Sequence, residues 1–240
     1  MRLRTEGARV LVEAAIAEGV CTYIHESVSF VYAEGGAKWI SEEAPTDAGD
    51  MALSRATLDG EAEAERFTNA GRRGIVLRFA GFYGADAAST IETVTLLRRR
   101  MMPQIGSGSN YFSLIHVPDA GRGVAAAIGL PAGIYNVCDD EAVTFADYLG
   151  IGAQAVGVPE PFRFPAFLGK WMFGEVWKYF PRSVRASNAR LKKASGWKPE
   201  LRSVAEGGRS SPRSCVSKIQ SARAQRNGPN APRENTATLD

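Results

Sequence analysis

The chain is organised around the segment Tyr23-Ile24-His25-Glu26-Ser27-Val28-Ser29-Phe30-Val31-Tyr32. Its β-branched and aromatic residues are typical of a buried strand, and small polar side chains follow at its carboxyl end. Ligands of parallel α/β sheets bind at the carboxyl ends of the strands. The segment therefore predicts both a central strand and the place of a site.

The segments on either side predict helices and a second strand. Residues 7–18 and 52–69 have helical apolar spacing, and Gly19 and Gly71 follow them as helix-ending glycines. The apolar run 74–79 then predicts a strand parallel to residues 20–26. Alternation of helix and strand with short connections predicts the α/β class, with a doubly wound parallel sheet.

Composition narrows the classes of protein. The chain has 240 residues, of which 45% are hydrophobic, enough for a sizeable core. Three cysteines and two histidines lack the spacing of a zinc site, so we expect no bound metal and reduced thiols in a cytoplasmic protein. No apolar run reaches the ~20 residues that span a bilayer, and no export signal is evident.

The positive charge is concentrated at the C-terminal end. Residues 208–240 hold six basic and two acidic side chains, or +4, which leaves −1 of the total +3 for residues 1–207. This distribution is not typical of a nucleic-acid-binding domain. Because residues 208–240 contain few large apolar side chains, we expect a disordered basic tail there.

Three polar features in the middle of the chain each allow two interpretations. The spacing of Gly81, Gly84 and Ala87 fits a phosphate-binding turn, but an ordinary glycine turn is the favoured interpretation. His116 could belong to a site, although a packed core histidine is more common. The acidic run Asp139-Asp140-Glu141 could bind a cation, and we favour a solvated turn.

Several later segments predict further elements. Asp119 is placed to cap a helix over 120–128, Thr144 to cap one over 144–156, and a last helix is expected to begin at Arg185 and end at Gly196. The aromatic stretch 162–180 fits packing of a small lobe better than a membrane-surface helix.

In this order the segments resemble the extended short-chain dehydrogenase/reductases, the NAD-dependent epimerase/dehydratase family. The resemblance covers roughly residues 5–207, and each matching piece is weak alone. The pieces are residues 6–15, Ser27–Tyr32, Leu77–Gly84, Ile115–Asp119, Ile134–Val137 and Gly196–Pro199.

The resemblance implies a Rossmann-like sheet that binds NAD or NADP, with a small C-terminal substrate lobe drawn mainly from residues 84–112 and 140–207. It places Ser27, Ser29, Phe79, Gly81 and Phe82 at the cofactor. It places Ser113 and His116 toward a small-molecule substrate. No nucleic acid or membrane partner is implied, and a homodimer is left open.

The catalytic residues of the family are where this sequence departs most. In the family a tyrosine shuttles the proton, aided by a lysine four residues later. None of the seven tyrosines here has such a lysine, and an alignment puts Thr57 and Glu61 at the two positions, so no catalytic residue is assigned. Phe112 replaces an arginine that grips sugar-nucleotide diphosphates, and the family's glycine-rich turn has no counterpart.

The sequence thus predicts an NAD(P)-dependent epimerase, dehydratase or reductase-like protein for a sugar-like or other hydroxyl or carbonyl compound. Without the catalytic pair we expect weak or no activity. The abrupt start at Met1 and the change near Gly208 suggest a truncated chain, damaged at both ends of its gene. The alternative is a non-catalytic member that binds a nucleotide or a protein.

Overall fold

The computed structural model describes residues 3–49, 51–165, 167 and 182–210. Two predictions lie outside these residues: the tail, apart from residues 208–210, and most of the aromatic stretch 162–180. Cys215 also falls there. No helix of the described part combines the length and the apolar character needed to cross a bilayer.

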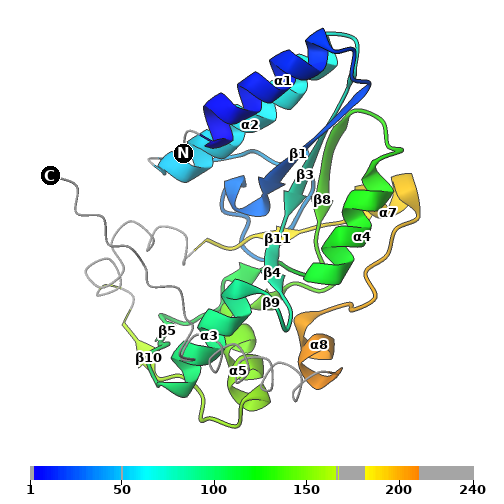
Figure 1. Cartoon of the computed structure of the whole chain (residues 1–240). Coiled ribbons are helices and arrows are strands. Elements are labelled where there is room, and N and C mark those ends of the chain that lie inside the picture. The colour runs from blue at the N-terminus through cyan, green and yellow to red at the C-terminus, as the bar shows by residue number, and fades with distance from the viewer. Residues whose placement is uncertain (1–2, 50, 166, 168–181, 211–240) are drawn as a thin grey trace, which may run out of the picture.

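The centre of the fold is a parallel three-stranded sheet in the order β1-β3-β8 (Figure 1). β1 is Thr22–Val28, β3 is Arg73–Phe79 and β8 is Gly133–Val137. Ile24 pairs with Ile75, and Leu77 pairs with Tyr135. The predicted parallel pairing of the first two strands is confirmed, and with it the α/β class.

Helices cover both faces of this sheet. α1 (Ala8–Ala17), preceded by a π-helical turn at Leu3–Gly7, and α2 (Ala52–Asn69) lie on one face. α4 (Val117–Ala127) and α7 (Ala189–Ser195) lie on the other (Figure 1). The arrangement is the doubly wound one that the sequence predicts.

A second group of elements lies beyond the carboxyl ends of the central strands. It contains the strand pair β4 (Gly81–Tyr83) and β7 (Leu114–His116), with α3 (Ala88–Arg98), α5 (Phe145–Ala155) and α8 (Val204–Ser210) around it. The short strands complete the fold in pairs. They are β2 (Trp39–Ile40) with β11 (Arg185–Ala186), β5 (Gln104–Ile105) with β10 (Arg163–Phe164), and β6 (Tyr111–Phe112) with β9 (Val143–Thr144).

Most predicted boundaries agree with the structure. Gly19, Gly71 and Gly196 have positive φ angles of 73°, 77° and 72°, as helix-ending glycines should. The Thr144 hydroxyl accepts a hydrogen bond from the Asp147 N–H at 3.1 Å, so its role as the α5 N-cap is confirmed.

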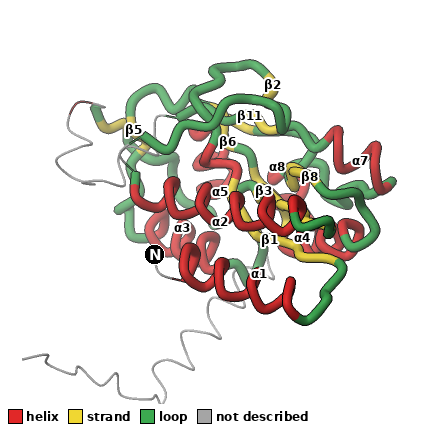
Figure 2. Tube along the Cα trace, turned by 90° about the horizontal axis from the view of Figure 1, so that it is seen from above, coloured by secondary structure: helices red, strands yellow, loops and turns green. Residues whose placement is uncertain are grey.

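Three sequence predictions were wrong. The first segment is strand only to Val28, and Ser29–Val31 turn into a 3₁₀ helix. Arg185 begins no helix: Arg185 and Ala186 pair with β2, as Figure 2 shows at the edge of the molecule. Asp119 lies inside the first turn of α4 and does not cap it; its carboxylate bonds the distant residues 200 and 201.

Candidate functional site

Polar side chains form a row across the central sheet near its carboxyl end. Ser27 on β1 is in register with Arg78 on β3, and Arg78 with Asn136 on β8. In-register residues of parallel strands point to the same face, so all three belong to one side of the sheet. All three are buried, as is Glu61 of α2, which contacts Ser27 and Arg78.

Glu61 joins this row into one network. Its carboxylate receives two hydrogen bonds from the Arg78 guanidinium, at 2.8 and 2.6 Å, and a short one from the Ser27 hydroxyl. Burial disfavours the charge on Arg78, but the bonds to Glu61 outweigh that effect and raise the pKa of the guanidinium. The Arg78 guanidinium is therefore held in its charged form against the Glu61 side chain.

Tyr32 closes the network on its other side. The Arg78 guanidinium lies 4.7 Å from the Tyr32 ring centroid, and the Tyr32 hydroxyl donates to Asn136 Oδ1 at 2.7 Å. Burial raises the pKa of this phenol despite Arg78 beside it. Tyr32 is thus a neutral structural donor, not a proton shuttle.

Thr57 and Glu61, which the resemblance aligns with the family's catalytic pair, both have bonds of their own. The Thr57 hydroxyl donates to the Leu53 carbonyl of its own helix at 2.9 Å, and Glu61 is bound to Arg78. Glu61 and Arg78 form a buried ion pair at 2.6 Å. Neither side chain is free to act as a proton shuttle in this arrangement.

The predicted cofactor residues gather near the ends of β1 and β3. Ser29 is buried, and its hydroxyl has no hydrogen-bond partner within the described residues. Phe79 and Phe82 pack with ring centroids 5.4 Å apart, and Phe82 is 37% exposed. The Gly81 N–H donates to the Ser113 carbonyl at 3.0 Å, which links this group to the predicted substrate residues.

The two predicted substrate residues have different surroundings. The Ser113 hydroxyl donates to the Val184 carbonyl and accepts from the Ala186 N–H, both at 2.9 Å, so it fixes the segment that contains β11. His116 lines a cavity instead, with Tyr83 packed against its ring at 5.4 Å between centroids. Burial lowers the pKa of His116, which keeps the imidazole neutral near pH 7.

Phe112 sits in an aromatic cluster, at the position where the resemblance implies an arginine. Its ring stacks on Phe30 at 5.8 Å and meets Tyr148 edge-on at 5.5 Å. These contacts offer a sugar-nucleotide diphosphate no cation at this position.

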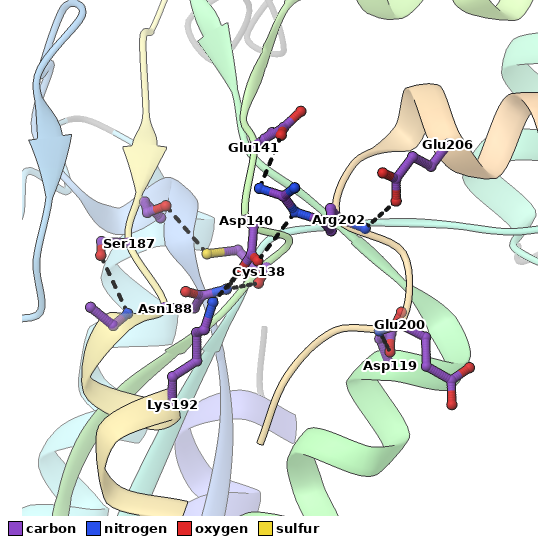
Figure 3. A network of polar contacts seen from close by, with 12 residues as sticks. Asp119, Cys138, Asp140, Glu141, Ser187, Asn188, Lys192, Glu200, Arg202 and Glu206 are labelled. Atoms are coloured by element: carbon purple, nitrogen blue, oxygen red, sulfur yellow. Dashed lines mark hydrogen bonds and ion pairs between the residues drawn. The ribbon is translucent and has the colours of Figure 1, made fainter. Parts of the chain in front are cut away.

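The acidic run is not the solvated turn that we favoured. Asp139 is 3% exposed, and burial raises its pKa to about 7. Asp140 bonds Lys192 at 2.9 Å and Asn188 at 2.9 Å, and these partners lower its pKa despite partial burial (Figure 3). Only Glu141 is exposed.

The described residues as a whole do not meet the requirements of a metal site. No cluster of His, Cys, Asp or Glu suited to a metal ion occurs among the described residues. Both cysteines of this part are free, and burial raises the pKa of the Cys138 thiol.

Sequence reasoning overlooked Arg78, Tyr83, Asn136 and the burial of Asp139. A signal for Arg78 existed, because a charged side chain inside the apolar run 74–79 needs a buried partner. No comparable signal marked Tyr83 and Asp139, which become neighbours only in the folded chain.

Known proteins resemble this chain in sequence and in fold. The 3-diazoavenalumate denitrifying reductase of a Streptomyces species is 35% identical over 213 residues, which cover 86% of this chain and 70% of that protein. An epimerase family protein of Mycobacterium bovis is 28% identical over 69% of this chain, and the match spans 55% of the relative's length. A comparison with protein-family models gives no match.

Solved structures agree on the fold. The UDP-glucose 4-epimerase of Thermotoga maritima with UDP-glucose has a TM-score of 0.74 at 20% identity, over 92% of this chain and 71% of that one. The human epimerase family protein SDR39U1 with NADPH has a TM-score of 0.73 at 17% identity, over 86% and 71%. NAD or NADPH is the cofactor in several of these structures. The chain belongs to the NAD-dependent epimerase/dehydratase family of extended short-chain dehydrogenase/reductases, whose cofactor is NAD(P).

Proposed function

We propose that this chain binds NAD(P)H and reduces a sugar-like or other carbonyl compound slowly at best. Reduction is preferred to epimerisation because the 35% identical relative is named a reductase, whereas the epimerase family protein is 28% identical. The observation that carries the low rate is the buried Glu61–Arg78 pair. The resemblance implies a lysine at this place, one that lowers the pKa of a catalytic phenol.

The residues near the ends of β1 and β3 fit a nicotinamide in part. The buried Ser29 hydroxyl, unpartnered within the described residues, can bond a polar group, and the exposed edge of Phe82 offers apolar surface to a ring. Bound NAD(P)H would supply the hydride. The chain's own residues would bind and orient the reactants, while proton delivery would lack the usual phenol and ammonium.

Fluorescence titration with NADH and NADPH tests the binding. We expect saturation at micromolar nucleotide and several-fold weaker binding in Ser29→Ala. Ser41→Ala, at an exposed serine, is the matched control and should bind like the wild type. Absence of saturation with either nucleotide would refute the proposal.

A second candidate function is non-catalytic binding of a nucleotide or a protein. The observation that favours it is again the Glu61–Arg78 pair, because a permanently compensated charge pair has a structural role without catalysis. The rate of NAD(P)H oxidation in the presence of sugar-like ketones distinguishes the two functions. Slow turnover supports the reductase, and tight binding with no turnover supports the second candidate.

A further inference from the structure

The second group of elements encloses a cavity of about 240 Å³. β4 and β7 form one wall, and α3, α5 and α8 form the others. The helices contribute apolar side chains, among them Val94, Ile151, Ala155 and Val204. Apolar cavities of about 150 Å³ hold a benzene molecule, so this one can hold a single substituted ring.

One polar group on the strand wall is incompletely bonded. Tyr83 is 5% exposed, and its hydroxyl completes no hydrogen bond of normal geometry with the described residues. The tyrosine reaches α8: a Cβ on Gly207, which lines the cavity, would lie 2.8 Å from Tyr83 Cε2 and 3.6 Å from its hydroxyl. The nearby acceptor is the buried Asp139 carboxyl, which is not aligned well enough to complete the bond, and a ligand oxygen aligned with the hydroxyl would complete it.

A second polar group lies on the same wall. A Cβ on Gly84 would lie 3.6 Å from His116 Nε2, and both residues line the cavity. The other ring nitrogen, Nδ1, lies 3.7 Å from Asp119 Oδ2. Nε2 is therefore the nitrogen nearer the cavity, and it can exchange a hydrogen bond with a ligand.

The charges around this wall restrict the ligand further. The buried Asp139 carboxyl lies beside the Tyr83 hydroxyl, and Asp119 lies behind His116. An anionic ligand would meet these carboxyl groups, and a cation would lose its hydration against apolar helices. A neutral ligand is therefore the class that fits this cavity.

We propose that this cavity binds a neutral single-ring aromatic alcohol, of the phenol class, with its oxygen at Tyr83 and His116 and its ring against α3 and α5. The inference goes beyond the proposed reductase function. Of the residues that the resemblance places at the cofactor or substrate, only His116 lines this cavity, so we expect binding without NAD(P)H.

Isothermal titration of the full chain with phenol and with toluene tests the polar contact. For the wild type we expect phenol to bind about tenfold tighter than toluene. In Tyr83→Phe the preference for phenol should fall to about threefold or less, because the His116 contact remains, and toluene binding should be unchanged. Equal affinities in the wild type, or no binding of either compound, would overturn the proposal.

Filling the cavity tests its location. Ala155→Leu adds a larger side chain at the lining, so both compounds should lose at least tenfold in affinity. Gln154→Leu, at the neighbouring exposed position of α5, is the matched control and should bind like the wild type. Unchanged phenol binding in a folded Ala155→Leu protein would show that phenol binds elsewhere. If that variant does not fold, the Tyr83→Phe comparison decides the matter.

Discussion

The buried Glu61 side chain is held entirely by its neighbours. Its carboxylate accepts three hydrogen bonds, two from Arg78 and one from Ser27, and all three residues are buried. A lysine at position 61 would face the Arg78 guanidinium, and the like charges would repel in a medium of low dielectric constant. Glu61→Lys would therefore bury two like charges side by side.

Removing one partner of this pair should destabilise the protein strongly. Glu61→Ala leaves the Arg78 guanidinium buried and unpaired, so we expect a loss of about 3–5 kcal/mol in the free energy of unfolding. Urea denaturation measures it. The control is Glu63→Ala, which breaks a pair with Arg66 whose side chain is 42% exposed, and should cost less than ~1 kcal/mol. Similar losses in the two variants would contradict this account.

Asp139 should make the stability depend on pH. Burial raises its pKa from 3.8 to about 7, so between these values the folded state binds a proton that the unfolded state releases. Stability should then fall as pH rises from about 4 through about 7, by roughly 4 kcal/mol at most. Melting curves of the wild type and Asp139→Asn at pH 4.5 and pH 8 measure the difference.

Comparison with Asp139→Asn removes the contribution of other titrating groups to the pH dependence of stability. His25 and His116 have pKa values lowered by burial, and they act in the opposite direction as pH falls through about 6.5. Both histidines are present in both proteins, so subtraction isolates Asp139. An unchanged difference between the two proteins at the two pH values would show that Asp139 does not titrate as described.

At the scale of elements, local signals predicted the fold well. The 18-residue helix α2 begins and ends where apolar spacing and Gly71 predict, because both signals act within a few residues. β11 was missed because its conformation depends on distant groups. The Ser113 hydroxyl and strand β2 hold Arg185 and Ala186 extended, and neither is near them in sequence.

Two glycines of adjacent helices should respond to alanine in opposite ways. Gly121 lies inside α4, and a Cβ there would meet no atom within 4 Å, so Gly121→Ala should stabilise by about 0.5–1 kcal/mol. Gly196 ends α7 at φ 72°, where alanine is strained, so Gly196→Ala should destabilise by about 1 kcal/mol. Chemical denaturation compares them directly, and equal signs would refute the conformational argument.

At the scale of the molecule, the candidate site is only partly readable from sequence. Ser27 and Ser29 were predicted because they follow a strand, and the strand end brings them near Phe79 and Phe82. Glu61 and Arg78 are 17 positions apart in the sequence, and their pairing joins a helix to a strand. The approach of Tyr83 to Asp139 spans two elements, and residue order alone cannot supply it.

The contacts of Asp119 are also long-range, and they should matter for the stability of the whole chain. Its side chain is fully buried at the start of α4, and its carboxylate accepts from the Glu200 N–H at 2.7 Å and the Leu201 N–H at 3.2 Å. The carboxylate therefore ties the helix on the central sheet to the segment that leads into α8 (Figure 3 shows Asp119 beside Glu200).

Asp119→Ala should loosen this connection, because two backbone donors and Arg122 lose their acceptor at once. We expect a loss of about 3 kcal/mol and much faster hydrogen exchange at the amides of Glu200 and Leu201. Glu200→Ala removes a 73% exposed partner of Arg122 and leaves both backbone bonds, so it should cost less than ~0.5 kcal/mol. If both variants have the same stability and the same exchange rates, the tie between the two parts runs through other contacts.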